Sequence, residues 1–132
     1  MDDSSKQIVQ AVNASKSAVV IAQKVIWAGS SSERRRGLLG RTGLGSDEGI
    51  YLTPCEWLHT FGMKFPIDVA FISPGGLILA VHYGLKPNRL SKIVFRAEGA
   101  LELAEGTLRK TNTEVGDAVE FLKTHSSGSI LA

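Results

Sequence analysis

The chain has 132 residues, of which 43% are apolar, 7% aromatic and 21% charged, and its 15 basic and 13 acidic residues leave a net charge of +2. This length predicts one domain with a core of its own, and the composition excludes a disordered or a collagen-like chain. The single cysteine, Cys55, excludes a disulfide-rich domain, and the near-neutral charge argues against a dedicated nucleic-acid-binding protein.

Residues 1–16 are mostly polar, and we expect them to form a mobile N-terminal tail, although Ile8, Val9 and Val12 suggest one apolar face of a short helix. The opening residues lack the apolar region of a secretory leader. No stretch reaches the roughly 18 apolar residues that cross a bilayer. The sequence therefore predicts a soluble, cytoplasmic protein with no membrane partner.

The first regular signals follow this segment. Residues 18–27 are rich in valine and isoleucine, which predicts a strand. Ser30 and Glu33 have the spacing of a capping box, which predicts a short helix near residues 31–39. The glycine-rich stretch 40–49 lacks both the spacing and the following long helix of a nucleotide-binding loop, so a phosphate site is not favoured there.

Most of the remaining chain predicts short strands. Pro74, Gly75 and Gly76 favour a hairpin turn between strands at 68–73 and 77–83. Further elements are expected as strands at 49–53, 91–96, 100–104 and 118–122, and as a helical turn within 105–113. These signals predict a mainly β (α+β) fold, a compact and mostly antiparallel six- to seven-stranded sheet or barrel with one short helix. The expected boundaries are a single β-rich domain at 17–123 and a mobile tail at 124–132.

Residues 54–69, with the sequence PCEWLHTFGMKFPIDV, concentrate the residue types that carry chemistry. Cys55, His59 and Met63 stand at i, i+4 and i+8, which places successive members near one face of a helix or a strand. Their order is that of a blue-copper ligand loop, but no histidine precedes Cys55, and a structural zinc site needs more cysteine and histidine ligands. We therefore expect no metal and no cofactor.

The simplest interpretation of residues 54–69 is that they belong to the core. Beside it, three functional hypotheses remain for the chain. The first is a binding module for a small, anionic ligand, with a cleft lined by His59, Met63 and Asp68 and with Arg41 and Arg89 at its mouth. The second is a small enzyme that uses His59 or Asp68 as its acid or base. The third is an interaction or scaffold protein with an exposed β-edge or a basic segment at 86–96. The candidate ligand-binding residues are Arg41, Cys55, His59, Met63, Asp68 and Arg89.

The charge of the basic segment does not by itself indicate a nucleic-acid partner. Residues 82–97 hold Lys86, Arg89, Lys92 and Arg96 without any acid, whereas the following segment is acidic. The segment lacks an aromatic platform motif on which bases would stack. We therefore expect no nucleic-acid partner, and we expect a monomer.

The chain resembles a bacterial and archaeal family, known as domain of unknown function 192, in the runs ERRRGLLGR, EGIYLTPCEWLHTFGMKFPIDVAFIS, LKPNR, ALELAEGT and VGD. The resemblance covers residues 18–122, and its most specific part is 54–69. It implies a compact β-rich domain without an established biochemical activity. The family-like positions in this chain are Arg35, Gly37, Leu38, Arg41, Pro54, Cys55, His59, Thr60, Met63, Pro66, Asp68, Pro87 and Arg89.

Overall fold

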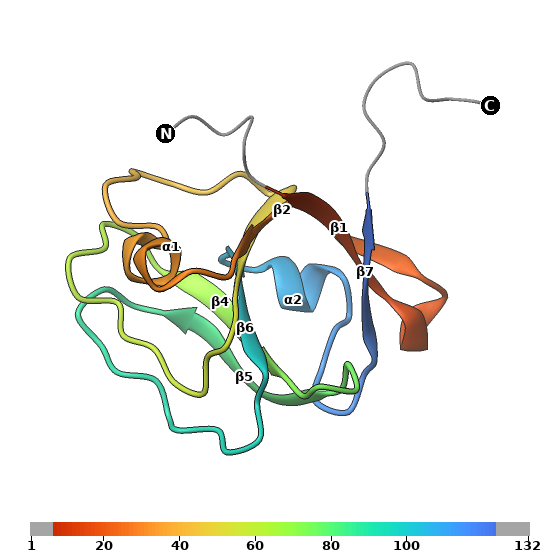
Figure 1. Cartoon of the computed structure of the whole chain (residues 1–132). Coiled ribbons are helices and arrows are strands. Elements are labelled where there is room, and N and C mark those ends of the chain that lie inside the picture. The colour runs from red at the N-terminus through yellow and green to blue at the C-terminus, as the bar shows by residue number, and fades with distance from the viewer. Residues whose placement is uncertain (1–6, 124–132) are drawn as a thin grey trace.

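The computed structural model describes residues 7–123, in which seven strands form one curled, half-barrel sheet (Figure 1). The strands are β1 (Ile8–Asn13), β2 (Val19–Ala28), β3 (Glu48–Leu52), β4 (Ile67–Ile72), β5 (Ile78–Leu85), β6 (Gly99–Ala104) and β7 (Val119–Lys123). The helices are the 3-10 helix η2 (Ala14–Lys16), α1 (Ser31–Arg36) and α2 (Thr107–Lys110). The predicted mainly β class is confirmed. Over this part of the chain, no helix has the length and apolarity that would let it cross a membrane.

The order of strands across the sheet is β5-β4-β6-β3-β2-β1-β7. All neighbours are antiparallel except β2 and β3, which run parallel and are joined through α1. Parallel neighbours need such a crossover connection, whereas antiparallel neighbours can be joined by a tight turn. The predicted hairpin is confirmed in β4 and β5, which pair on either side of the turn at 73–77.

The two edge strands, β5 and β7, meet at one end of the sheet. Leu77 and Ala118 form an antiparallel bridge there, and the amide of Val119 donates to the carbonyl of Gly76 at 2.8 Å. Gly76 has a φ of +94°, and a Cβ at this position would lie only 2.9 Å from the Val119 carbonyl oxygen, so the contact requires glycine. Backbone hydrogen bonds therefore close one end of the half-barrel and shorten its open edges.

Apolar side chains pack on both faces of the sheet. The inner cluster receives residues from every strand and from α2, among them Val9, Val25, Tyr51, Ile72, Ile78, Leu101, Leu108 and Val119. The outer cluster covers the opposite face of the central strands, and it includes Leu38, Ile50, Leu52, Leu58, Met63, Ile67, Val69, Phe71 and Val94. Strands β3, β4 and β6 are consequently buried on both faces, and a polar residue on either face of these strands is shielded from water.

The prediction of a mobile tail at 1–16 is wrong for its described part. β1 lies inside the sheet, between β2 and β7, and Val9 and Ala11 are buried in the inner cluster. Gln10, between them, points to the other side and donates from Nε2 to Oε1 of Gln23 at 2.6 Å. The alternation of a half-buried strand is present, but it is too short to stand out among polar neighbours. Residues 1–6 and the expected tail at 124–132 lie outside the described residues.

The predicted strand at 91–96 is also wrong, because burial there has a period of three and a strand needs a period of two. The buried positions are Ser91, Val94 and Ala97. They belong to residues 86–97, here called the basic loop, which runs beside residues 54–63, here called the aromatic segment. The amide of Ser91 donates to the carbonyl of Leu58 at 2.9 Å, one of several bonds between the two. These bonds satisfy the loop backbone outside the sheet.

A buried polar network joins the end of β1 to the turn before β7. Asn13 is fully buried, and its Nδ2 donates to Oγ1 of Thr113 at 3.0 Å and to Oδ2 of Asp117 at 2.9 Å. The same carboxylate oxygen of Asp117 pairs with the ammonium of Lys16 at 3.0 Å. Side chains as well as the backbone therefore fix the first strand to the last one.

Candidate functional site

A cavity of about 620 Å³ opens on the outer face of the sheet, between α1 and the aromatic segment. Its volume is in the range of small-molecule binding sites, which are typically about 300–1,000 Å³. One wall is helical and basic, the opposite wall is aromatic, and residues of β3 and β6 contribute to its base. The cavity therefore combines apolar surface with a few polar groups, as ligand sites usually do.

The helical wall is positioned by the predicted capping box, in which the side chain of Ser30 accepts from the amide of Glu33 and the side chain of Glu33 accepts from the amide of Ser30. The guanidinium of Arg34 donates to two backbone carbonyls at 3.0 and 3.3 Å, which fixes the helix to the strands beside it. Arg35 and Arg36 line the cavity and are exposed, and neither forms an ion pair within the described residues. Their charges are available to a ligand.

The aromatic wall consists of Trp57, His59 and Phe61, all exposed. The rings of His59 and Phe61 stack with centroids 4.8 Å apart, and the ring of Trp57 lies 6.5 Å from that of His59. The amide of Phe61 donates to Nδ1 of His59 at 3.2 Å. Since Nδ1 accepts, the neutral imidazole carries its proton on Nε2, which has no hydrogen-bond acceptor among residues 7–123.

Glu102 lies at the base of the cavity, in the middle of β6. Leu101 and Leu103 point into the inner cluster, so the alternation of the strand turns Glu102 to the outer face. There its cross-strand neighbours are Ile50 on β3 and Val69 on β4, both apolar and buried. Only 4% of Glu102 is exposed, and its Oε1 has no hydrogen-bond partner in the described part of the chain.

Burial raises the pKa of Glu102 from its ordinary value of 4.5 to about 7, because the apolar surroundings disfavour the charged carboxylate. Near neutral pH the group is therefore divided between its protonated and ionised forms, and it can donate or accept a hydrogen bond. Buried polar atoms in folded proteins nearly always have partners. A titratable group without one, inside a cavity, is typical of a functional site.

Cys55 lies in the same cavity, half-buried, and its thiol donates to the carbonyl of Trp57 at 3.2 Å. Burial raises the pKa of this thiol to about 11, and the neighbouring carboxylate of Glu102 adds to the rise. Because the thiolate is the nucleophilic form of cysteine, the thiol is unreactive near neutral pH.

We expect iodoacetamide to alkylate Cys55 roughly a hundredfold more slowly in the folded protein than in the denatured one, because the raised pKa leaves little thiolate. Mass spectrometry of the intact protein over time measures this rate, and Cys55→Ser controls for labelling elsewhere. Glu102→Gln is expected to increase the folded-state rate. Equal rates in the folded and denatured protein would contradict the prediction.

Of the six predicted ligand-binding residues, the structure brings three together in this cavity: Cys55, His59 and Met63. Arg41 lies in a smaller adjoining hollow, which shares residues at the end of α1 with the cavity. Its guanidinium pairs with the carboxylate of Glu48 at 3.2 Å, so its charge is already compensated. Within residues 7–123, no three histidine, cysteine or acidic side chains are arranged to hold a metal ion.

The prediction that Asp68 lines this cleft is wrong. Its neighbours Ile67 and Val69 face the outer cluster, so Asp68 points to the inner face of β4. There its carboxylate accepts three backbone amides, from Gly84 at 2.9 Å, Gly106 at 3.1 Å and Leu108 at 3.0 Å. Asp68 is a structural residue that fixes the turn into α2 and the end of β5.

Arg89 does not line the cavity either, so the predicted mouth formed by Arg41 and Arg89 is wrong. Arg89 lies on the basic loop, where its guanidinium contacts two neighbouring backbone carbonyls at 3.4 Å. Its amide donates to Oγ1 of Thr60 at 2.9 Å, which holds the loop against the aromatic segment. The arginines at the cavity are instead Arg34, which is bonded to backbone carbonyls, and the exposed Arg35 and Arg36.

Sequence analysis missed Glu102, because a glutamate that alternates with leucines normally marks the solvated face of a strand. The signal that points to its burial lies in other strands. The runs GIYL in β3 and IDVAFI in β4 are apolar at nearly every position, which is typical of strands buried on both faces. A strand that pairs between two such strands is buried on both faces as well.

Comparison with known proteins supports this architecture. The family described as "Uncharacterized ACR", domain of unknown function 192, matches residues 11–121. A crystal structure of a Sinorhizobium meliloti 1021 protein named "putative transcription regulator" has a TM-score of 0.73 and 26% identity, over 89% of this chain and 94% of that one. A protein of unknown function from Novosphingobium aromaticivorans DSM 12444 has the same fold, with a TM-score of 0.71 and 20% identity over 87% and 84%. No curated protein matches the chain.

Proposed function

The chain belongs to the domain of unknown function 192 family, and we propose that it is a small-molecule binding module whose cavity takes a ligand with both an anionic group and a hydrogen-bond donor group. The observation that carries this proposal is the unpartnered Oε1 of Glu102 at the base of the cavity. A buried polar atom without a partner destabilises the free protein. A ligand that donates a hydrogen bond to this oxygen removes that cost.

The two walls indicate the rest of the ligand. Arg35 and Arg36 offer guanidinium groups to a carboxylate or another anion. Trp57 and Phe61 offer exposed aromatic faces to a flat, apolar group. An amine-bearing acid with an aromatic or otherwise flat apolar part would contact all three features at once. Such a ligand satisfies Glu102 with its amine and the arginines with its acid group.

The geometry supports the enzyme hypothesis and the β-edge hypothesis less well than it supports a binding module. Of the two residues predicted as the acid or base of an enzyme, only His59 lines the cavity, whereas the carboxylate of Asp68 accepts three backbone amides on the other face of the sheet. An interaction through a β-edge needs long free edges, and the edges of this sheet are partly paired with each other.

Three related probes test the proposal: phenylalanine, phenethylamine, which lacks the carboxylate, and 3-phenylpropionate, which lacks the amine. Titration into isotope-labelled protein is expected to shift the backbone amide signals of residues 34–39 and 55–63 in NMR spectra. We expect each truncated probe to bind roughly tenfold more weakly than phenylalanine, because each loses one hydrogen-bonded charge.

Two variants test which cavity residue contacts the amine of the probe and which contacts its carboxylate. Glu102→Gln is expected to weaken phenylalanine and phenethylamine but not 3-phenylpropionate, whereas Arg36→Ala is expected to weaken the two carboxylates only. Lys24→Ala, at an exposed lysine on β2 outside the cavity, is the matched control. The proposal fails if none of the probes shifts the cavity amides, or if Glu102→Gln leaves the affinities of all three unchanged.

A further inference from the structure

The basic loop repeats one pattern three times. Its buried residues Ser91, Val94 and Ala97 anchor it to the protein, and an exposed pair of residues precedes each anchor. Each pair consists of one cation and one large apolar residue: Arg89 with Leu90, Lys92 with Ile93, and Arg96 with Phe95. The period of three therefore gathers three cations and three apolar side chains on the outward side of the loop.

The apolar members of these pairs are unusually exposed for their size. Leu90 is 61% exposed, Ile93 59% and Phe95 75%. Phe95 is more exposed than any other large apolar residue among those described. Contiguous exposed apolar residues on a folded protein usually mark a surface that another molecule covers.

The charge of the loop is of one sign. Lys86 adds a fourth cation, and residues 86–97 contain no acid. Glu56 of the aromatic segment contacts the loop, where its carboxylate accepts the backbone amide of Arg96 at 2.9 Å, and the exposed Glu98 follows the loop directly. Within residues 7–123, none of the four cations forms an ion pair. The surface that covers this loop is therefore expected to be negatively charged.

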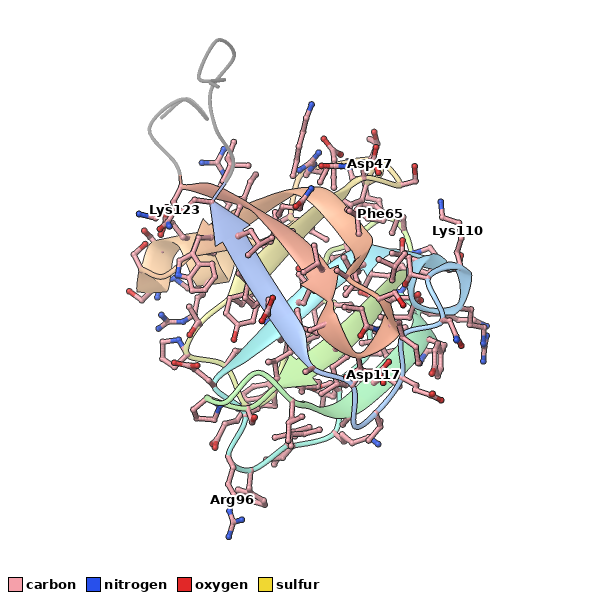
Figure 2. All side chains as sticks on the ribbon, turned by 90° about the vertical axis from the view of Figure 1, so that its right-hand side faces the viewer. Asp47, Phe65, Arg96, Lys110, Asp117 and Lys123 are labelled. Atoms are coloured by element: carbon pink, nitrogen blue, oxygen red, sulfur yellow. The ribbon has the colours of Figure 1, made fainter. Side chains whose placement is uncertain are left out.

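The loop is held in this shape mainly by hydrogen bonds to the aromatic segment, and its Lys92 amide also donates to Nε2 of His82 on β5 at 3.4 Å. Its backbone is bonded to the aromatic segment at Ser91 and at Val94, whose amide donates to the carbonyl of Glu56 at 2.7 Å, and Leu90 forms a bridge with His59. Figure 2 shows that Arg96 projects from the body of the domain. The apolar residues are therefore presented on a preformed, projecting loop.

We propose that the basic loop docks this protein on an anionic lipid surface, with Leu90, Ile93 and Phe95 entering the headgroup region and the cations contacting lipid phosphates. Apolar residues flanked by lysine and arginine are the usual composition of such peripheral contacts. A nucleic acid would use the cations but gain little from Leu90 and Ile93. A second copy of the chain would bring like charges together. This inference does not depend on the cavity or its ligand.

The expectation of no membrane partner rested on the absence of an apolar span, and a docking loop needs none. The sequence indicated the basic segment at 86–96 as a possible interaction surface, but it did not show the exposed apolar side chains there, because the three anchors were assigned to a strand. Only the observed burial separates the exposed pairs from the anchors.

Co-sedimentation of the full chain with lipid vesicles tests the proposal. We expect binding to vesicles that contain phosphatidylglycerol, weaker binding as salt rises, and little binding to phosphatidylcholine alone. Ile93→Ser and Phe95→Ser are each expected to reduce the partition coefficient roughly tenfold. Lys92→Gln and Arg96→Gln are each expected to reduce it roughly fivefold. Val115→Ser and Lys110→Gln, which alter exposed residues outside the loop, are the matched controls and are expected to bind as the unaltered protein does.

Three results would overturn the proposal. The first is the absence of binding to the anionic vesicles, or binding that the loop variants do not weaken. The second is binding of single-stranded oligonucleotides that is weakened by Lys92→Gln and Arg96→Gln but not by Phe95→Ser. This result would assign the loop to nucleic acid. The third is a molecular mass in solution that rises with protein concentration for the unaltered chain but not for Phe95→Ser. This result would assign the surface to self-association.

Discussion

Near pH 8, Glu102→Gln is expected to raise the free energy of unfolding by about 3 kcal/mol, whereas near pH 5 it is expected to change it by less than about 1 kcal/mol. The reason is the difference between the pKa of this carboxyl group in the folded chain, about 7, and its ordinary value of 4.5. Glutamine has nearly the same shape as protonated glutamate, but it never carries the buried charge.

The direction of the pH dependence follows from the raised pKa of Glu102. Between about pH 4.5 and pH 7 the folded chain holds this proton and the unfolded chain releases it, so the stability of the unaltered protein falls as the pH rises through this window. Above about pH 7 the folded protein has lost this whole contribution to its free energy of unfolding, because Glu102 is then ionised in nearly every folded molecule. The variant has no such group and is expected to lose this part of the pH dependence.

Thermal unfolding at several pH values measures the effect. For a chain of this size, about 3 kcal/mol corresponds to a rise in Tm of roughly 10 °C. Glu120→Gln is the matched control, because Glu120 is exposed on β7 and its substitution removes the same charge from the surface. If both variants shift Tm equally, or if the gain of Glu102→Gln is the same near pH 5, the buried charge is not the cause.

The second large effect concerns Asp68. Asp68→Ala is expected to reduce the free energy of unfolding by roughly 3–5 kcal/mol, because it removes the acceptor of three backbone amides at once. The amide of Leu108 is buried, so leaving it without an acceptor carries a desolvation cost. Asp68→Asn keeps one acceptor oxygen and is expected to cost about half as much.

Urea denaturation of the Asp68 variants measures this loss. Asp47→Ala is the control, since Asp47 is exposed in the loop before β3 (Figure 2), and surface substitutions usually change stability by less than about 0.5 kcal/mol. A loss below about 1 kcal/mol in Asp68→Ala would contradict the structural role of this carboxylate. The result also bears on the enzyme hypothesis, because a residue that fixes the backbone so firmly is not free to transfer protons.

The fold could be predicted where the signal is local. The hairpin of β4 and β5 depends on a turn and two neighbouring apolar runs, and α1 depends on one capping box. β1 and the basic loop could not be assigned in this way, because their structure depends on distant partners. β1 is a strand because β2 and β7 flank it, and the basic loop takes its period of three from its contacts with the aromatic segment.

The site was predictable in part for the same reason. Cys55, His59 and Met63 are close in sequence, and their segment stays together in space. Asp68 belongs to the same run of sequence, but one step along a strand reverses the face, and the side chain turns away from the cavity. Glu102 comes from a distant strand, and only the pairing of β6 between β3 and β4 brings it to the base of the site.

The pairing of β1 with β7 has a consequence for how the chain is made. Asn13 and Asp117, which are bonded to each other, are 104 positions apart. During synthesis, the edge of β1 that pairs with β7 stays unpaired until β7 has left the ribosome. Phe121 then completes the aromatic contacts of Trp27 and Tyr51, at 5.3 and 4.6 Å. Closure over such a distance is slow. The edge of β1 that pairs with β7 is therefore the part of the sheet that stays exposed longest in the nascent chain.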